Sequence, residues 1–258
     1  MSIAAGPCVA QTNLLLDIDI ASEKVYPGSG ATVTDVVSGY VFTANNPTYY
    51  TFSNGTVQFT RSASAPKDGG GMRVAGVAGS LAANTFLYND FSWEVWVRID
   101  DRQPGNYDGT EGVSAIALYD GYHSGWTYGP TTVDFVLWNT GPAGVYVQQY
   151  TLGGAGSGLN VIEGTWNQLV ITKSGTSYTK YKNGSIVGSA NTANITIPSP
   201  FIVNSNINIG KAANVGAGVG SYLCYSKNTF AAMRMYNRAL STSEIAGNFA
   251  ATRGRFGI

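Results

Sequence analysis

The sequence predicts an all-β protein, a two-sheet antiparallel sandwich with one short helix near its C-terminus. Three observations indicate this fold. Apolar runs of about four to eight residues recur along the chain, separated by Gly, Asn, Pro, Asp and Ser, the residues that favour turns. The 258 residues include 33 glycines. Charged residues make up only 12%, too few for long solvated helices.

Strands are expected where apolar and polar residues alternate. The clearest is 92–99, in which every second residue would face the same side of a sheet. One side would carry Trp93, Val95, Val97 and Ile99, and the other Ser92, Glu94, Trp96 and Arg98. The other expected strands are 14–20, 56–61, 114–119, 131–138, 145–150, 166–173, 177–182, 185–188, 206–209 and 229–236.

One hairpin and one helix have specific local signals. Asn183-Gly184 lies between two expected strands and predicts a two-residue type I′ turn, because both central residues of that turn need positive φ. The helix is expected over 242–249, where Ser241 and Glu244 have the spacing of a capping box. Gly247 weakens the last turn, so the helix should be short.

A single domain is expected over 1–258, because no repeat, charge block or proline-rich linker marks a boundary; residues 1–11 are expected to form a loose N-terminal arm. Fifteen basic residues balance fifteen acidic ones, which argues against a nucleic-acid partner. No signal peptide or membrane-spanning apolar run is evident. The only cysteines, Cys8 and Cys224, are expected to be buried thiols rather than a disulfide framework.

Five motifs from Phe91 onward resemble the laminin-G-like, concanavalin A-like jelly-roll family. They are FSWEVWVRI (91–99), GTWNQLVIT (164–172), YKNG (181–184), NIG (208–210) and MRMYNRALSTSEI (233–245). Their order and intervals carry the resemblance. It implies a jelly-roll sandwich that ends in a Tyr-Asn-Arg turn capped by the short helix.

Motifs near both ends are similar to virion proteins of tailed bacteriophages that have this fold. They are LLLDIDI (14–20), YPGSG (26–30), DVVSG (35–39), VQFT (57–60) and NFAATRGRFGI (248–258). DVVSG has one residue more than the usual Asp-x-Ser-Gly. The resemblance implies a non-enzymatic decoration or cement protein on the virion exterior, made in the host cytoplasm. Its implied partners are other virion proteins, above all the major capsid protein, and further copies of itself.

An alternative function is a tail or head fibre adhesin that binds glycan on the host cell surface. The candidate ligand residues lie in LYDGYHSGWTYGP (118–130), where aromatic rings could stack on sugars and a carboxylate could bind hydroxyls. They are Tyr119, Asp120, Tyr122, His123, Trp126 and Tyr128. The same composition fits a protein contact. It also fits a packed loop, since aromatic rings near sheets are usually buried for their area alone.

A glycoside hydrolase is a further alternative, and it would need two carboxylates about 5 to 9 Å apart. Glu94 and Glu163 are isolated in the sequence. For Asp17 and Asp19 the resemblance implies a structural role, in which they pair an edge strand with the last hairpin. No Gly-x-Ser-x-Gly motif precedes His123, the only histidine. The sequence therefore predicts no catalytic residue and no enzyme.

Two sets of charged residues are candidates for metal and partner binding. Asp100, Asp101, Asp108 and Glu111 offer hard oxygen ligands for calcium but lack the regular spacing of a dedicated site, so a solvated acidic loop is the alternative. No other cofactor is predicted. Arg253 and Arg255 are expected at an interface with a neighbouring chain. For Arg238, internal bonds that hold the helix against the sheet are favoured.

Overall fold

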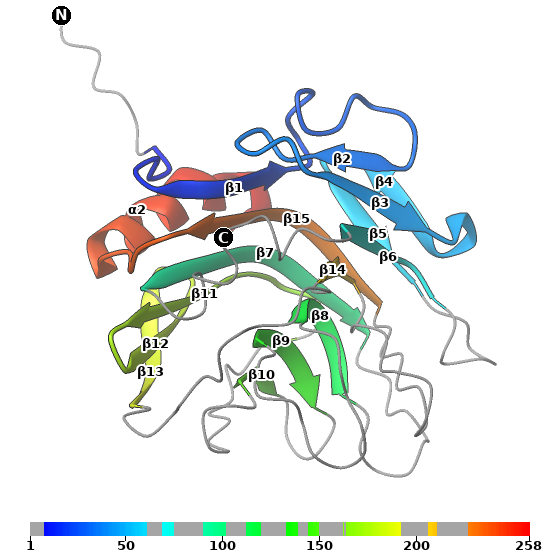
Figure 1. Cartoon of the computed structure of the whole chain (residues 1–258). Coiled ribbons are helices and arrows are strands. Elements are labelled where there is room, and N and C mark those ends of the chain that lie inside the picture. The colour runs from blue at the N-terminus through cyan, green and yellow to red at the C-terminus, as the bar shows by residue number, and fades with distance from the viewer. Residues whose placement is uncertain are drawn as a thin grey trace, which may run out of the picture.

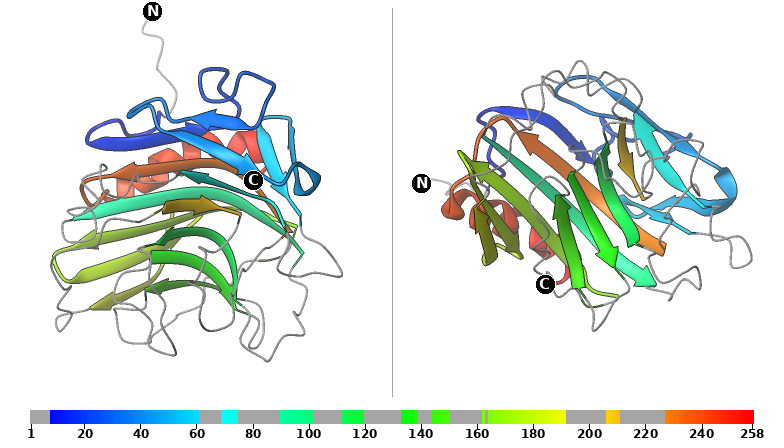
Figure 2. Two further views of the ribbon diagram at one scale, coloured as in Figure 1. Left: turned by 45° about the vertical axis from the view of Figure 1, so that its right-hand side comes forward. Right: turned by 60° about the horizontal axis from the view of Figure 1, so that its bottom comes forward.

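The computed structural model describes residues 8–60, 69–74, 90–101, 112–119, 133–138, 144–149, 162, 164–191, 206–210 and 227–258. For residues 101, 112–119, 133–138, 144–149, 190–191 and 206–208 it describes the backbone only. Two antiparallel sheets face each other, and a C-terminal helix lies on the outer side of one of them (Figures 1 and 2). The predicted all-β sandwich is confirmed.

The two sheets, here called A and B, together contain the strands labelled in Figure 1. Sheet A has eight strands in the order β13-β12-β11-β7-β15-β5-β4, with β1 also paired to β15. Sheet B has seven strands in the order β10-β9-β8-β14-β6-β3-β2. Their bounds are β1 Leu14–Asp19, β2 Thr32–Thr34, β3 Val41–Asn45, β4 Tyr50–Ser53, β5 Thr56–Phe59, β6 Gly71–Val74, β7 Phe91–Asp101, β8 Gly112–Tyr119, β9 Val133–Trp138, β10 Gly144–Gln149, β11 Trp166–Ser174, β12 Ser177–Lys182, β13 Ser185–Asn191, β14 Asn206–Ile209 and β15 Lys227–Tyr236.

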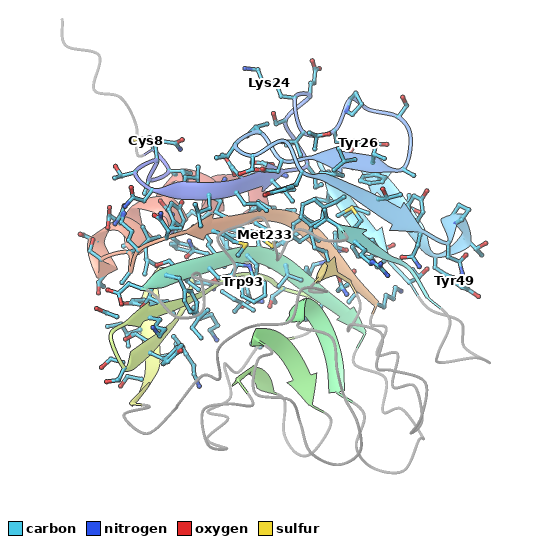
Figure 3. All side chains as sticks on the ribbon, in the orientation of Figure 1. Cys8, Lys24, Tyr26, Tyr49, Trp93 and Met233 are labelled. Atoms are coloured by element: carbon cyan, nitrogen blue, oxygen red, sulfur yellow. The ribbon has the colours of Figure 1, made fainter. Side chains whose placement is uncertain are left out.

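The main core lies between the sheets, and alternation along β7 sends side chains into it as predicted. Trp93, Val95, Val97 and Ile99 are all fully buried in this core. Met233 of β15 is buried in the same core, and Figure 3 labels it with Trp93. Such burial contributes roughly 1.5 to 3 kcal/mol for each large apolar side chain.

The opposite side of β7 is also buried, which its alternating pattern did not predict. Trp96 and Glu94 have no exposed surface because the C-terminal helix α2 (Thr242–Thr252) covers this side of sheet A. Phe249 of α2 packs against Trp96, and Ile245 packs in a second small cluster beside it. Sheet A is therefore buried on both sides where α2 crosses it.

The predicted type I′ turn at Asn183-Gly184 is confirmed. The two residues have φ of 51° and 76°, and Lys182 pairs directly with Ser185 across the turn. A second turn of this kind, at Asn54-Gly55 between β4 and β5, was not predicted, although its sequence signal is the same. Its φ values are 49° and 68°.

The predicted capping box of α2 is confirmed, since Ser241 and Glu244 each accept a hydrogen bond from the other's backbone N–H. The helix is longer than expected: it runs past Gly247 to Thr252 and continues as the 3-10 helix η4 (Arg253–Phe256). Burial of Asn248 and Thr252 against the protein outweighs the low helix propensity of glycine. None of the helices in the described residues has the length and apolar character that crossing a bilayer requires.

Four strands, β2, β3, β4 and β6, were not predicted. Each has only three to five residues, although β5 and β14, with four residues each, were predicted. A further short element, the 3-10 helix η1 (Pro47–Tyr49), separates β3 from β4. Where strands were predicted, their ends differ from the observed ends by up to three residues.

The expected loose N-terminal arm (1–11) is held to the fold at Ala10, and so is Thr12, which follows the arm. The backbone N–H of Ala10 donates to Asn248 Oδ1 at 2.8 Å, and Tyr236 donates to the carbonyl of Ala10 at 3.1 Å. Arg238 Nε donates to the carbonyl of Thr12. Cys8, expected to be buried, is exposed with a free thiol (Figure 3), and Cys224 lies outside the described residues.

Candidate functional site

Three carboxylates meet on the outer side of sheet A, and they form the carboxylate cluster (Asp17, Asp19 and Glu94). In the register of the sheet, Asp17 of β1 lies opposite Arg234 of β15, and Arg234 lies opposite Glu94 of β7. Cross-strand neighbours on one side of a sheet are close enough to pair. Neighbouring strands therefore bring together residues that are far apart in the sequence, including Glu94, which the sequence left isolated.

Arg234 is the centre of this cluster. Its Nε lies 3.1 Å from Asp17 Oδ1, its NH1 lies 3.3 Å from Glu94 Oε1, and its NH2 lies 3.9 Å from Asp19 Oδ2. The Nε and Oδ1 atoms are buried and close, but they do not align as a hydrogen bond. Arg234 and Asp17 thus meet as an ion pair. The expected structural role of Asp17 and Asp19, pairing β1 with the last strand, agrees with these contacts.

Burial and charge shift the proton affinities in the cluster. Burial raises the pKa of Asp17, an effect that Arg234 opposes and the neighbouring carboxylates reinforce. Burial alone would lower the pKa of Arg234, but Glu94 and Asp17 raise it above its usual value. Arg234 therefore stays charged and holds the carboxylates in place.

Glu94 is completely buried, and both of its oxygens accept hydrogen bonds. Oε1 accepts from Gln168 Nε2 at 3.0 Å and from Trp96 Nε1 at 3.2 Å, besides Arg234. Oε2 accepts from Asn248 Nδ2 at 2.6 Å. Burial thus keeps the Glu94 carboxylate out of contact with solvent.

Asn248 of α2 links the cluster to the N-terminal segment. Its side chain donates to Glu94 and to the Tyr236 hydroxyl, and it accepts from the backbone of Ala10. Burial raises the pKa of Tyr236, and the charge of Glu94 adds to this rise. One asparagine thus connects the helix, two strands and residue 10.

Four aromatic rings form an aromatic stack where the C-terminal segment crosses sheet A; two of the ring pairs are stacked and the third is tilted. Trp96 stacks with Phe249, with ring centroids 5.8 Å apart, and with Phe256, with centroids 4.5 Å apart. The ring of Trp166 lies 4.4 Å from that of Phe256. Each such pair adds about 0.5 to 1.5 kcal/mol beyond its buried area, so the stack fixes η4 on the sheet.

The arginines of the C-terminal segment make mainly internal contacts. Arg255 NH1 lies 2.5 Å from Asp19 Oδ1, and Arg255 also donates to the carbonyl of Gly55. Arg238 forms a two-pronged pair with Glu244, which lowers the pKa of Glu244 to about 2. Arg253 is exposed and lies over the ring of Phe249, with no carboxylate partner among the described residues. An interface role therefore remains a prediction, and the Arg255 guanidinium already has a carboxylate within its own chain.

Asp100, the first residue of the predicted calcium set, accepts hydrogen bonds from protein groups at both oxygens. Arg98 Nε lies 2.5 Å from one oxygen, and Thr229 Oγ1 and Gln58 Nε2 donate to the other. The side chain of Asp101 and residues Asp108 and Glu111 lie outside the described residues, so calcium binding stays a prediction. In the part of the chain that the structure describes, no group of three or more His, Cys, Asp or Glu side chains is arranged to hold a metal.

The predicted glycan residues lie almost entirely outside the described part of the chain. Tyr119 is the last residue of β8, and only its backbone is described. The others, Asp120, Tyr122, His123, Trp126 and Tyr128, are outside the described residues. Their role in binding glycan stays a prediction.

The hairpin between β2 and β3 carries three exposed valines, here called the valine tip (Val36, Val37 and Val41). Their exposed fractions are 47%, 43% and 48%. Asp35, only 1% exposed, accepts backbone hydrogen bonds from Ser38 at 2.6 Å and from Val37 at 3.2 Å. It also accepts from the backbone of Asp17 at 2.7 Å. In the DVVSG motif the buried Asp35 carboxylate thus fixes a turn that leaves Val36 and Val37 exposed to solvent. The extra residue of the motif is one of these two valines.

Comparisons with solved structures find the same sandwich in proteins of little sequence identity. The sialidase of Trypanosoma rangeli in complex with 2,3-difluorosialic acid is 16% identical with a TM-score of 0.66, and the match covers 99% of this chain and 35% of the sialidase. The receptor-binding domain of the botulinum neurotoxin C/D mosaic serotype is 10% identical with a TM-score of 0.60, covering 92% and 51% of the two chains. This chain therefore spans about a third of the sialidases that it matches.

A third similar structure is that of botulinum neurotoxin type C, whose cell entry is described as dependent upon interaction with two ganglioside molecules. It is 12% identical with a TM-score of 0.60, and the match covers 92% of this chain and 50% of the toxin chain. At such identities these matches show the fold alone.

The comparison with protein-family models agrees with the laminin-G-like resemblance. No curated protein matches the chain. The family model of the Concanavalin A-like lectin/glucanases superfamily, in its laminin G branch, matches residues 75–246. That range is well over half of the 258 residues and includes the central strand β7, the Asn183-Gly184 hairpin and the start of α2. The chain belongs to the Concanavalin A-like lectin/glucanases superfamily.

Proposed function

We propose that the protein is a non-enzymatic structural protein of a tailed-bacteriophage virion. In this role it covers or cements the outside of the capsid through non-covalent contacts with the major capsid protein and with its own copies. The motifs that resemble phage virion proteins support the location. The observation that carries the non-enzymatic role is that every member of the carboxylate cluster is already engaged within the protein: Glu94 is fully buried with both oxygens hydrogen-bonded, and Asp17 and Asp19 pair with Arg234 and Arg255.

The valine tip supports a role in binding other proteins. Exposed β-branched apolar residues at a hairpin tip are unusual, since turns favour Gly, Asn, Asp and Ser. The hydrogen bonds of Asp35 hold the tip in one conformation, which reduces the entropy that a binding partner would have to remove. Between Lys24 and Arg61 the sequence has one charged residue, the buried Asp35. Interface cores are depleted of charge in the same way.

Purified phage particles test the location. Mass spectrometry of intact, washed virions should detect the protein, and a cryo-EM map should show its sandwich on the capsid surface. Its absence from intact particles would refute the proposal. Incubation of the protein with bacterial polysaccharides should release no reducing ends; their release would refute the non-enzymatic role.

Rebinding to particles that lack the protein tests the surface. The double variant Val36→Lys/Val37→Lys places two charges on the tip and should reduce binding at least about tenfold, equivalent to about 1.4 kcal/mol. Ile186→Lys/Val187→Lys is a matched control, because those β13 residues are similarly exposed, at 56% and 42%. Equal binding of both variants and the wild type would exclude the tip as the contact.

A glycan-binding adhesin is the second candidate function, favoured by the aromatic residues of 119–128 and by the fold shared with a ganglioside-dependent toxin. A glycan array should then show binding that Trp126→Ala abolishes and Tyr40→Ala leaves intact. If Trp126→Ala changes neither glycan binding nor adsorption to cells, this candidate is wrong.

A further inference from the structure

The two Asn-Gly turns of sheet A have the same backbone form but differ around the asparagine side chain. Both are two-residue type I′ turns, one closed by the Ser53–Thr56 pair and the other by the Lys182–Ser185 pair. Both asparagines have φ near 50°. The pair therefore allows one chemical property, the reactivity of asparagine before glycine, to be compared within a single protein.

Hydrogen bonds and packing restrain the Asn183-Gly184 turn. Asn183 Oδ1 accepts from the backbone N–H of Gln168 at 2.9 Å, and the backbone N–H of Asn183 donates to the carbonyl of Gln168 at 2.9 Å. The backbone N–H of Gly184 donates to Gln168 Oε1 at 3.0 Å. Phe249 covers the turn, lying 3.2 Å from the position that a Cβ on Gly184 would occupy. These contacts hold the Asn183 side-chain amide away from the backbone nitrogen of Gly184.

The Asn54-Gly55 turn lacks these restraints. The Asn54 side chain is exposed, and no hydrogen bond to its amide is found among the described residues. The carbonyl of Gly55 accepts from Arg255, and Ala21 lies against Gly55, but these contacts fix the glycine rather than the Asn54 amide. The Asn54 side chain is therefore free to turn toward the backbone nitrogen of Gly55.

We propose that Asn54 is a site of spontaneous deamidation and that Asn183 is protected from it. The Gly55 backbone nitrogen attacks Asn54 Cγ, and the new N–Cγ bond replaces the bond to the side-chain nitrogen. That nitrogen leaves as ammonia, carrying the proton of the Gly55 N–H, and a cyclic imide remains. Water then opens the imide at one of its two carbonyls and yields aspartate or isoaspartate. Glycine favours the attack because it has no side chain beside the nucleophilic nitrogen.

The product changes the charge at a junction of the fold. A carboxylate at residue 54 adds a negative charge one residue from the carbonyl that Arg255 binds. Isoaspartate also adds a methylene to the backbone of a turn whose two-residue length sets the pairing of β4 with β5. Ageing would therefore alter the place where the C-terminal segment is fastened to this hairpin.

Peptide mass spectrometry after incubation of the full-length protein at mildly alkaline pH tests the proposal. In the folded protein, Asn54 should convert about tenfold faster than Asn183 or more, because reaction at Asn183 requires local opening first. In denaturant the two rates should become similar, since both asparagines precede glycine. An isoaspartyl-specific methyltransferase should label the aged peptide that contains residue 54.

Gln168→Ala provides the complementary test, since it removes the side chain that binds the Gly184 N–H. Conversion at Asn183 should rise several-fold while conversion at Asn54 stays unchanged. If this variant does not fold, the conversion rates of Asn54 and Asn183 in folded and denatured wild-type protein still test the proposal. The proposal would be overturned if Asn54 kept its amide in the folded protein while both sites converted in denaturant. Equal conversion at Asn54 and Asn183 in the folded protein would also overturn it.

Discussion

Arg234 is the residue on which the buried charges of sheet A depend. Its side chain is 5% exposed and lies within 4 Å of carboxylate oxygens from Asp17, Asp19 and Glu94. Buried ion pairs bring little net stability, but removing one partner leaves an uncompensated buried charge. The arrangement therefore fixes the position of β1 more than it strengthens the fold.

Arg234→Met should destabilise the protein by about 3 to 5 kcal/mol, because it leaves Glu94 buried without its cation. Urea unfolding measures this change. Arg253→Met is the control, since Arg253 is exposed over Phe249, and it should change stability by less than about 0.5 kcal/mol. Equal effects of the two substitutions would show that the cluster has no special dependence on Arg234.

Glu244, in the first turn of helix α2, has a pKa far below its usual value. The pair with Arg238 and the backbone of Ser241 lower the pKa of Glu244 from 4.5 to about 2. A depressed pKa means that the folded state favours the ionised form. Its contribution to stability is complete above the unfolded value and is lost as the pH falls through the folded value.

Acid unfolding of Glu244→Gln tests this contribution. Between about pH 5 and pH 2 the wild type should lose more stability than the variant, because only the wild type must protonate Glu244. Asp17 acts in the opposite sense: its pKa is raised, so its protonation favours the fold as the pH falls. If stability fell equally with pH in the wild type and in Glu244→Gln, the acid-dependent loss could not be attributed to Glu244.

The Asn183-Gly184 turn depends on glycine for two separate reasons. Gly184 has a φ of 76°, and a Cβ there would lie 3.2 Å from Phe249. Gly175, in the turn between β11 and β12, is a comparison site: it has a φ of 57° but open space around the position of a Cβ. Gly175→Ala should therefore cost only the left-handed backbone, about 1 to 2 kcal/mol.

Gly184→Ala should cost more than Gly175→Ala, since the methyl group also presses on Phe249. Gly184→Val should cost most, because a β-branched residue is least suited to positive φ. Thermal melting of the three variants gives the order. Wild-type melting of Gly184→Val would mean that the hairpin does not need this turn.

At the scale of the whole molecule, an N-terminal segment and a continuous C-terminal segment, far apart in the sequence, meet on the outer side of sheet A. Residues 10–12, α2 and η4 meet there through Asn248, Tyr236 and the aromatic stack (Figure 1). The N-terminal segment and the C-terminal helix therefore stabilise each other.

Asn248→Leu should destabilise the protein by about 1.5 to 3 kcal/mol, because Glu94 loses its shortest hydrogen bond. Hydrogen exchange at the Ala10 amide should become faster, since that amide donates to Asn248. Thr252→Val on the same helix removes only a bond to the Asn248 carbonyl and should leave Ala10 protected. Unchanged exchange at Ala10 in Asn248→Leu would show that other contacts hold the N-terminal segment.

The sequence by itself determined the features that depend on neighbouring residues. The alternation in β7, the Asn183-Gly184 turn and the capping box of Ser241 and Glu244 were all predictable, because each is set by spacing over a few positions. The short strands β2, β3, β4 and β6 were not predicted, and length alone does not explain this, because β5 and β14 have four residues each and were predicted.

Only the tertiary structure decided what surrounds each polar side chain. Glu94 is isolated in the sequence, yet the pairing of β1, β15 and β7 sets it beside Arg234 and Asp17, and the packing of α2 removes it from water. The same holds for the anchored residues 10–12 and for Asp35 beneath the valine tip. Such contacts join positions separated by 18 to 238 residues, and strand order and helix docking, rather than local spacing, create them.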